Sequence, residues 1–297
     1  MRILIDCRCL QKPAPRSGVG VLTEGMLRAL LAADSTNEYF LFANGFVDPR
    51  RYLPTFGAPN VRWIIRRIPN KILNGAWSLG LHAWRFPKVD ILLVPNPNFL
   101  PTLPRDIPLV LVVHDLSFEH FRDCFTPKQR LLYRLMHPRK LLHRADAIIA
   151  VSETTKRDVM ETYGIPEEKV HVVYPGIEHP NLRMDPNAPN GEEFVAFGSG
   201  IRSIRMFPDP YILTLSAIEP RKNIDGLIAA FERLTPLHLY TSTPPLHLII
   251  AGIPGSATPA IRRQIARSPA RDRIHLLGPV SESEKHALLA RASCFVY

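Results

Sequence analysis

Short apolar runs alternate with longer amphipathic stretches along most of the chain. The apolar runs before residue 175 are rich in Val, Ile and Leu and largely continuous, which is typical of strands buried on both faces of a sheet. These runs are residues 3–6, 39–43, 61–65, 89–94, 109–114, 147–151 and 170–174. Helix-like stretches lie at 19–31, 72–85, 127–143 and 152–163. The alternation predicts an α/β fold, with a parallel sheet wrapped by helices.

A second alternating series follows residues 177–210, a segment that is rich in Pro, Gly and Asn and lacks periodicity. We interpret this segment as a linker. Strands are predicted at 211–217, 246–251, 274–277 and 293–297, and helices at 223–234, 259–267 and 281–292. We therefore expect two Rossmann-like domains, 1–176 and 211–297, with a cleft between them. Because a doubly wound domain has about six strands, we expect the second domain to be incomplete.

Composition narrows the classes of function. A length of 297 residues suits two domains. An apolar fraction of 46% and a charged fraction of 22% exclude wholesale disorder. Lys and Arg together number 37 and Asp and Glu 27, which gives a net charge of +10. This surplus favours an anionic partner, such as nucleotide phosphates, nucleic acid or an acidic membrane face.

The cysteines and the apolar runs indicate the compartment. Four cysteines are too few for a disulfide scaffold at this length. Cys7 and Cys9 have no further Cys or His at ligand spacing, so we expect buried thiols rather than a metal site. The first apolar run is too short for a signal-peptide core, and no run approaches the ~20 residues that span a bilayer. We expect a cytoplasmic protein.

A glycine motif opens the first predicted helix. Gly18, Val19 and Gly20 follow the first strand and Ser17. Glycines let the backbone approach a ligand, and a helix N-terminus offers free N–H groups to an anion. Since Thr occupies position 23, the full dinucleotide fingerprint is not present. The motif therefore suggests an anion site, with a plain turn as the alternative.

His114 ends the fifth predicted strand. Ligands of open α/β sheets bind at the carboxyl ends of strands. We expect His114 to orient a sugar hydroxyl or to polarise a leaving group, in preference to a purely structural role.

Two cations stand between the first strand and the first helix of the second series. They are Arg221 and Lys222, and Asn223 follows as a predicted N-cap. A helix N-terminus is already partly positive, so further cations there are unfavourable unless an anion binds. This context predicts a phosphate site.

Residues 61–88 hold all the tryptophans, several cations and no acid. Tryptophan favours the membrane–water interface, and cations there feel anionic lipids. Two readings stay open: a membrane or acceptor surface, or a basic helix packed on the sheet by its tryptophans. The residues assigned to the surface are Trp63, Arg66, Arg67, Lys71, Trp77 and Trp84. Residues 128–144 form a second acid-free basic stretch that favours the membrane reading.

Nucleic acid is the less favoured anionic partner. The sequence has no helix-turn-helix, no zinc-finger spacing and no RNP-like aromatic strand. Apolar strand segments interrupt the basic clusters. We therefore expect a nucleotide ligand and no nucleic acid.

Five segments, taken in order, resemble the retaining glycosyltransferases of the GT-B fold, in the large family of mannosyl- and glucosyltransferases of polysaccharide assembly. The segments are DCR (6–8) with SGVG (17–20), VVHDL (112–116), ADAIIAVS (145–152) with VVYPGI (172–177), LSAIEPRKN (215–223) and IHLLGPVS (274–281). The resemblance implies a retaining hexosyl transfer from a nucleotide-diphosphate sugar to a saccharide or lipid-linked acceptor. It also implies an acceptor-side first domain and a donor-binding second domain.

The resemblance also assigns roles to residues. The loop 215–223 is similar to the family's donor-phosphate loop, and Gly278, Pro279 and Val280 to the loop that faces the base. Members of this fold generally need no metal, and the sequence has no DxD-type cluster, so we expect no cofactor.

Two departures from the family keep alternatives open. The family's paired glutamates after the fourth strand are absent, and Ala217 stands where many members carry an arginine. The chain is therefore also compatible with an inactive, truncated nucleotide-binding fragment. A sugar-nucleotide epimerase is a further alternative. We expect an enzyme in the cytoplasm, either free or peripheral on the inner face of the membrane.

Overall fold

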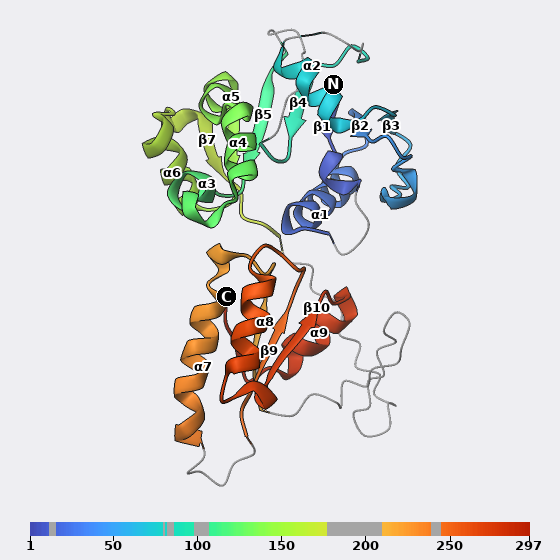
Figure 1. Ribbon diagram of the computed structural model, residues 1–297. Helices are drawn as coiled ribbons and strands as arrows, with labels where there is room; N and C mark the ends of the chain where they lie inside the picture. Colours follow the sequence, from blue (N-terminus) through green and yellow to red (C-terminus); the bar gives the residue numbers. More distant parts are fainter. Residues whose placement is uncertain (12–15, 80, 82–85, 98–106, 177–209, 239–244) are drawn as a thin grey trace, which may run out of the picture. The chain divides into compact units, whose positions relative to one another are not determined.

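The computed structural model describes residues 1–11, 16–79, 81, 86–97, 107–176, 210–238 and 245–297 (Figure 1). Contacts divide the chain into two compact units, Met1–Glu178 and His179–Tyr297, and each is taken by itself. The predicted linker, apart from Pro210, lies outside the described residues.

The described part of unit 1 contains a seven-stranded parallel sheet with the order β3-β2-β1-β4-β5-β6-β7. The strands are β1 (Arg2–Asp6), β2 (Glu38–Asn44), β3 (Val61–Arg66), β4 (Ile91–Val94), β5 (Leu109–Val113), β6 (Ala147–Ala150) and β7 (Val170–Val172). The helices are α1 (Gly18–Ala33), α2 (Asn70–Ser78), α3 (Ser117–His120), α4 (Pro127–Met136), α5 (Pro138–Arg144) and α6 (Glu153–Tyr163). The strand order reverses between β1 and β4, which is the switch point where doubly wound sheets bind ligands.

The continuous apolar runs are explained by burial on both faces of this sheet. Neighbouring residues of a strand point to opposite faces. Leu4 and Ile5 of β1 are both fully buried, and they belong to two different core clusters. Leu111 and Val112 of β5 divide between the same two clusters. A sheet with only one covered face would show alternating polar residues instead.

The described part of unit 2 contains a four-stranded parallel sheet with the order β10-β9-β8-β11. Its elements are β8 (Tyr211–Leu215), α7 (Ile224–His238), β9 (His247–Ala251), α8 (Thr258–Arg267), β10 (Ile274–Gly278), α9 (Glu282–Arg291) and β11 (Cys294–Phe295). The order 3-2-1-4 repeats that of the first four strands of unit 1. The predicted α/β class and the Rossmann-like pattern of both halves are confirmed.

Three predicted elements need correction. The stretch 127–143 is two helices, because Pro138 disfavours helical backbone at the preceding residue, and His137 is left-handed with φ 49°. The helix predicted at 72–85 is α2, which ends at Ser78. Residues 80 and 82–85 of the predicted helix lie outside the described residues. The predicted buried strand 293–297 is β11, an edge strand with β8 as its neighbour in the described sheet, and both of its residues are exposed.

The predicted ends of one helix are confirmed in detail. The hydroxyl of Ser152 accepts the N–H of Thr155 at 3.1 Å and caps α6. Gly164 ends the helix in the left-handed region with φ 68°, where a glycine carries no Cβ penalty.

Candidate functional site

The loops after β8, β9 and β10 are bonded to one another at the carboxyl edge of the unit 2 sheet. The N–H of Ser216 donates to Ala251 O at 3.0 Å, and the N–H of Gly252 donates to Gly278 O at 2.8 Å. The N–H of Ile218 donates to Ile253 O at 3.0 Å. These bonds continue the sheet pairing into the loops and hold a rigid edge beside the switch point between β8 and β11.

Two glycines allow this close approach, and the sequence pattern did not single them out. Gly252 has φ 152°, and an added Cβ would overlap the carbonyl oxygen of Ser216. At Gly255 an added Cβ would overlap the carbonyl oxygen of Ile218. The glycines are therefore required by backbone packing between the β8 and β9 loops.

The two predicted phosphate-binding cations differ in their charge balance. Arg221 and Lys222 lie in a 3₁₀ turn, Pro220–Lys222, directly before α7. Arg221 Nε donates to Glu219 Oε2 at 2.8 Å, so its charge is balanced by a carboxylate. Lys222 Nζ donates to the phenol oxygen of Tyr297 and lies 4.1 Å from the centre of that ring. Among the described residues no salt bridge involves Lys222, so its positive charge stands without a carboxylate partner there, next to the switch point.

Asn223 connects this turn to α7 with a left-handed backbone, φ 50° and ψ 38°. An N-cap residue ordinarily has an extended backbone. The Asn223 side chain lies against Gly226, where an added Cβ would come within 2.6 Å of its Oδ1. The predicted position at the head of the helix is correct, whereas its backbone conformation is not that of a standard N-cap.

The segment expected to face the base begins at the end of β10. Gly278 is left-handed with φ 78°, and its carbonyl is held by Gly252. Pro279 is exposed, while Val280 packs against a core cluster. Ser281 then caps α9 by a reciprocal bond pattern with Glu284. The loop is thus fixed at both ends and presents backbone rather than a polar side chain.

In unit 1, the ring of His114 follows β5 and is held by the loop after β4. His114 Nε2 lies 2.8 Å from Pro95 O. The hydroxyl of Thr155 donates to His114 O at 3.2 Å. Asp115 accepts the N–H and the hydroxyl of Ser117 at 2.9 and 2.6 Å, which turns the chain into α3. His114 is therefore oriented from both sides at the carboxyl edge of the sheet.

The glycine motif forms the first turn of α1. Ser17 caps the helix by accepting the N–H of Gly20 at 3.4 Å. Gly18 is exposed and Val19 is half-buried, and the N–H groups at these positions precede the first intrahelical bond. Gly20 is buried, and an added Cβ would lie 3.4 Å from Cys9 O. The second glycine thus has a packing role, and the first leaves the helix end open. Arg16 turns away to Glu24 and to Tyr52 O.

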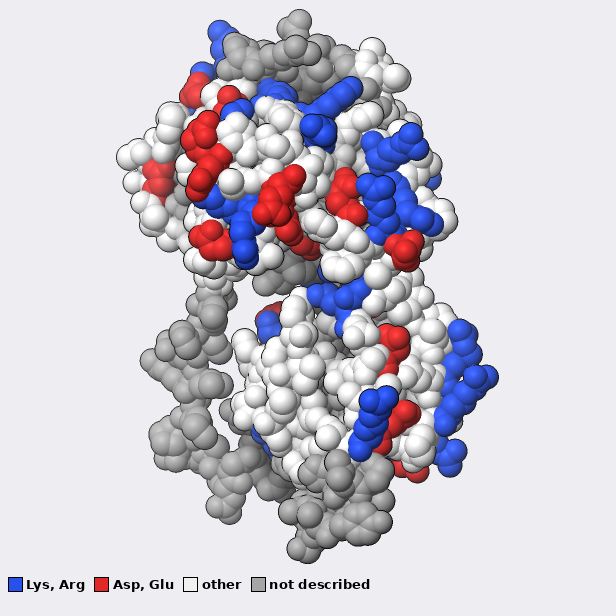
Figure 2. All heavy atoms as spheres, turned by 90° about the vertical axis from the view of Figure 1, so that its left-hand side faces the viewer, with Lys and Arg blue, Asp and Glu red and all other residues white. Residues whose placement is uncertain are grey.

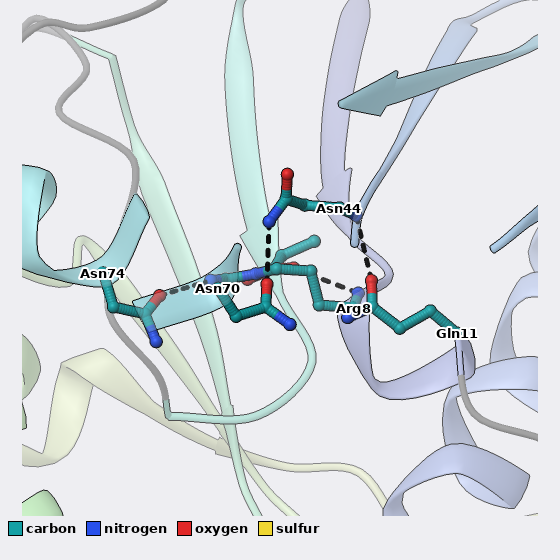
Figure 3. A network of polar contacts seen from close by, with 6 residues as sticks. Arg8, Gln11, Asn44, Asn70 and Asn74 are labelled. Atoms are coloured by element: carbon teal, nitrogen blue, oxygen red, sulfur yellow. Dashed lines mark hydrogen bonds and ion pairs between the residues drawn. The ribbon is translucent and has the colours of Figure 1, made fainter. Parts of the chain in front are cut away.

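A buried ion pair lies at the carboxyl end of β1, and neither charge was assigned a role from the sequence (Figure 3). Arg8 and Asp6 form two parallel bonds, Nε–Oδ1 at 2.9 Å and Nη2–Oδ2 at 2.6 Å, with side chains 5% and 4% exposed. Arg8 Nη1 also donates to Asn74 Oδ1 at 3.0 Å. Its guanidinium lies 4.9 Å from the centre of the Trp77 ring. The sequence did offer a signal for this pair, because Asp6 ends a buried strand and Arg8 follows two residues later.

Asn44 ties the ends of neighbouring elements together in the same network (Figure 3). Its side-chain amide donates to Ile68 O at 2.9 Å and to Asn70 Oδ1 at 2.8 Å. Its backbone N–H donates to Gln11 Oε1 at 2.9 Å. These bonds fix the entry into α2 against the end of β2.

Of the tryptophans assigned to the membrane or acceptor surface, Trp77 needs correction. Trp77 is 8% exposed and packs on Arg8 and Phe42, so it lies in the interior. Trp63 is half-buried and stacks on Phe56 with ring centres 6.3 Å apart. Trp84 lies outside the described residues. Trp77 of α2 packs its helix on the sheet, as the alternative of a packed basic helix expected. Trp63 belongs to strand β3 rather than to a helix.

The cations assigned to the same surface are placed differently. Arg67 and Lys71 are exposed, whereas Arg66 is partly buried at the end of β3. On the face in Figure 2, the described Lys and Arg residues form separate groups with acids and uncharged residues between them. No helix among the described residues is long and apolar enough to cross a bilayer.

The thiols near β1 behave as expected for interior side chains. Cys7 is buried, and burial raises its pKa well above the ordinary value. Burial also raises the pKa of Cys9 to about 11. The described residues contain no group of three or more His, Cys, Asp or Glu side chains that could hold a metal ion.

Each unit has a parallel Rossmann-like sheet, and the loops described above lie at its carboxyl edge, where such sheets bind ligands. Two such units define a doubly wound α/β protein of the GT-B type. Comparison with family models gives Glycosyltransferase Family 4 over residues 16–179 and Glycosyl transferases group 1 over residues 205–297. The first model covers more than half of the chain, so the chain belongs to Glycosyltransferase Family 4.

Named relatives are mannosyltransferases. The chain is 26% identical over 277 residues to the serotype-specific mannosyltransferase WbdA of Escherichia coli. The match covers 82% of this chain and 31% of the relative. It is 24% identical over 218 residues to the O-antigen chain mannosyltransferase B of Escherichia coli, which covers 72% of this chain and 53% of the relative. The chain thus spans about a third to a half of the length of these curated relatives.

Solved structures show the same fold. WaaG, a glycosyltransferase involved in lipopolysaccharide biosynthesis, matches with a TM-score of 0.61 and 15% identity over 99% of this chain and 74% of that chain. Anabaena Alr3699/HepE in complex with UDP and glucose matches with a TM-score of 0.53 and 16% identity. This match covers 99% of this chain and 73% of that chain. At these identities the likeness establishes the GT-B fold.

Proposed function

We propose that this chain carries out glycosyl transfer from a nucleotide-diphosphate sugar to a saccharide or lipid-linked acceptor in polysaccharide or glycolipid assembly. The observation that carries the proposal is Lys222, which has no salt bridge within the described part of the chain and stands before the N-terminus of α7 at the switch point of unit 2. A diphosphate is the ligand that such a charge and a helix N-terminus attract together. The named mannosyltransferase relatives support a hexose as the transferred group.

The chemical task is to stabilise the diphosphate as it leaves the sugar. Lys222 supplies a point charge, and the first N–H groups of α7 supply a fixed positive dipole. Arg221 is paired with Glu219, so it neutralises the diphosphate only after its ion pair with that carboxylate breaks. We propose that these cations neutralise the leaving group without a resident metal cofactor.

The neighbouring loop is proposed to hold the base. The backbone of Gly278, Pro279 and Val280 follows β10 and is fixed by Gly252 on one side and by the capped α9 on the other. A rigid backbone edge can offer N–H and C=O groups to a base at little entropic cost.

In unit 1, His114 is proposed to orient a sugar hydroxyl. Its Nε2 carries the hydrogen that bonds Pro95 O, because a carbonyl oxygen only accepts. In the neutral ring, Nδ1 is then an acceptor for a hydroxyl. The open end of α1 at Gly18 and Val19 is proposed as a further anion contact. Retention at the anomeric carbon is inferred from the family resemblance.

The acceptor and its surroundings are also proposals. A lipid-linked acceptor would require the enzyme to work at the inner face of the membrane from the cytoplasm. Of the cations first assigned to that surface, Arg67 and Lys71 are exposed.

Three measurements test the function. The purified chain should bind a nucleoside diphosphate, measured by calorimetry, and should discriminate within a panel that includes GDP-mannose and UDP-glucose. Transfer to a lipid-linked saccharide should then follow in mixtures that contain the acceptor, and NMR of the product should show the donor's anomeric configuration. Absence of nucleotide binding would overturn the proposal. Acceptor-independent conversion of the donor sugar would identify an epimerase instead.

A further inference from the structure

Three primary amides lie around the carboxyl ends of β1, β2 and β3 in unit 1 (Figure 3). Gln11 follows the 3₁₀ turn after β1, whereas Asn70 and Asn74 lie in α2, which follows β3. Asn44, the last residue of β2, contacts Gln11 at 2.9 Å and Asn70 at 2.8 Å. Arg8 contacts Asn74 at 3.0 Å. The name amide set is used for Gln11, Asn70 and Asn74, which lie beside the switch point where such sheets bind ligands.

The bonding partners decide which end of each amide is held. The guanidinium of Arg8 can only donate, so Asn74 presents its oxygen to Arg8. The backbone N–H of Asn44 is likewise a donor, so Gln11 presents its oxygen there. The side-chain NH₂ group of Asn44 also donates to a backbone carbonyl, which can only accept, and this fixes its orientation. The same NH₂ group therefore meets the oxygen of Asn70.

The NH₂ groups of the amide set are left as donors. Within the described part of the chain, they make no hydrogen bond of their own. Asn70 is exposed, and Gln11 and Asn74 are half-buried. Figure 3 shows the oxygens turned to Asn44 and Arg8 and the nitrogens turned away from them. The amide set is thus a group of oriented donors at the carboxyl edge of the sheet.

The charges around the amide set are positive or balanced. The sequence has no Asp or Glu from 49 to 89. Arg67 and Lys71 flank Asn70 in the sequence and are exposed, and neither forms a salt bridge among the described residues. Asp6 is buried, and Arg8 bonds both of its carboxylate oxygens. Several donors without an unpaired carboxylate favour a ligand that brings acceptor oxygens and negative charge.

We propose that the amide set binds an oxyanion carried by a saccharide, either a carboxylate or a phosphate monoester. An oxyanion accepts several N–H donors at once, and each bond to a charged acceptor is stronger than a bond to a neutral hydroxyl. A neutral hydroxyl also has a hydrogen to donate, and the oxygens of the amide set are turned to their interior partners. The saccharide is the acceptor of the proposed function, on which that part of the inference rests.

The test measures binding of matched sugars that differ in one oxyanion to the whole 297-residue chain. The pairs are methyl glucuronide with methyl glucoside, and mannose 6-phosphate with mannose. NMR titration should show about tenfold tighter binding of the charged sugar in at least one pair, which is the difference between a charged and a neutral acceptor. Preference in the first pair assigns a carboxylate, and preference in the second assigns a phosphate.

Amide-to-carboxylate variants change the outward group and keep the inner bond. In Asn70→Asp, Asn74→Asp and Gln11→Glu, one oxygen still accepts from its interior partner, while the NH₂ donor becomes an oxygen that repels an anion. Each variant should bind the charged sugar about tenfold less or weaker still, with little change for the neutral sugar. Urea unfolding identifies any variant that fails to fold, and the other two then carry the test.

A matched control tests the same chemical change elsewhere in unit 1. Gln129 of α4 is exposed, and its oxygen accepts from the N–H and the hydroxyl of Thr126 at 2.9 and 2.8 Å. Gln129→Glu keeps that oxygen and replaces the NH₂ group, as in the other variants. It should bind every sugar as the wild type does. Affinity for GDP and UDP, which tests the donor site of unit 2, should be unchanged in every variant.

Four outcomes overturn the proposal. They are equal affinity within both sugar pairs, an unchanged preference in all folded variants of the amide set, an equal loss in Gln129→Glu, and a loss of nucleotide affinity in the amide variants, which would assign the set to the donor instead. A chain that prefers charged sugars but binds neither nucleotide would sink the proposed function and leave the amide set standing.

Discussion

His114 Nε2 donates its hydrogen to the backbone carbonyl of Pro95 across 2.8 Å, so the loop after β4 sets the ring that follows β5. Because β4 and β5 are paired neighbours, this bond links two adjacent strand ends at the carboxyl edge of the unit 1 sheet. The ring orientation is thus decided by the sheet order. Its remaining nitrogen, Nδ1, is the one that can meet a sugar hydroxyl.

Replacing His114 should affect transfer more than donor binding. His114→Ala should lower kcat/KM by about tenfold, since a neutral hydrogen bond is worth about 0.5–1.5 kcal/mol, and nucleoside diphosphate affinity should stay within about twofold. His171→Ala changes an exposed histidine of β7 and should leave both unchanged. Steady-state kinetics and calorimetry decide the matter. Equal turnover in His114→Ala would remove the residue from the mechanism.

Lys222 and Arg221 should contribute unequally to donor binding. Lys222→Ala should weaken nucleoside diphosphate binding by about 1.5–3 kcal/mol, the range for a hydrogen bond to a charged group. Arg221→Ala should cost less, because Glu219 already balances that charge. Lys285→Ala, a lysine that pairs with Glu282 on α9, serves as the control. Calorimetric affinities that rank Arg221 above Lys222 would contradict this assignment.

Gly252→Ala should destabilise unit 2. The new Cβ would overlap the Ser216 carbonyl, and the backbone has φ 152°, so we expect a loss of about 3 kcal/mol or more in the free energy of unfolding. Gly278→Ala, where φ is 78° and no atom lies within 4 Å, should lose about 1–2 kcal/mol from backbone strain alone. Gly57→Ala has open space and no positive φ and should be near neutral. Urea titrations measure all three.

The stability of unit 2 should fall on mild acidification. His247 Nδ1 lies 3.0 Å from His275 Nε2 on the neighbouring strand. Burial, followed by His275 and Arg273, lowers the pKa of His247, and burial lowers the pKa of His275. The folded unit therefore binds fewer protons than the unfolded chain once the pH drops below the ordinary histidine pKa. The stabilisation is complete above that pKa and is lost as the pH falls through the lower, folded pKa.

This pH dependence can be assigned with one substitution. His275→Gln should flatten the decline in the free energy of unfolding as the pH is lowered from neutral, whereas His171→Gln in unit 1 should leave it as in the wild type. Urea unfolding at a series of pH values provides the measurement. A slope that is the same in His275→Gln as in the wild type would exclude the histidine pair as its source.

Trp77 should matter for stability and not for vesicle binding. Trp77→Ala removes a buried ring that packs on Arg8 and Phe42, and truncation of a buried aromatic costs about 3–5 kcal/mol. Leu79→Ala changes a side chain that is 76% exposed and should be near neutral. Denaturation and vesicle co-sedimentation on the folded variants test both points. Loss of vesicle binding by folded Trp77→Ala would restore the interfacial role first inferred for this residue.

The sequence determined the fold class, the existence of the elements and the position of the candidate loops. Continuous apolar runs report burial on both sheet faces, and Ser152 and Gly164 mark helix ends, because these signals are local to the chain. The placement of Arg221 and Lys222 before α7 followed from the same local pattern.

Only the tertiary structure decided which groups meet. Glu219 balances Arg221 while Lys222 contacts Tyr297, 75 residues away, and this difference separates two cations that look alike in sequence. Trp77 turned inward to Arg8 whereas the leucines of α4 turned outward, although both lie in basic, acid-free stretches. The requirement for Gly252 came from the Ser216 carbonyl. The contacts of Lys222, Trp77 and Gly252 join segments that are far apart in the sequence. They exist only after strand order and helix packing are set, so periodicity and composition carry no record of them.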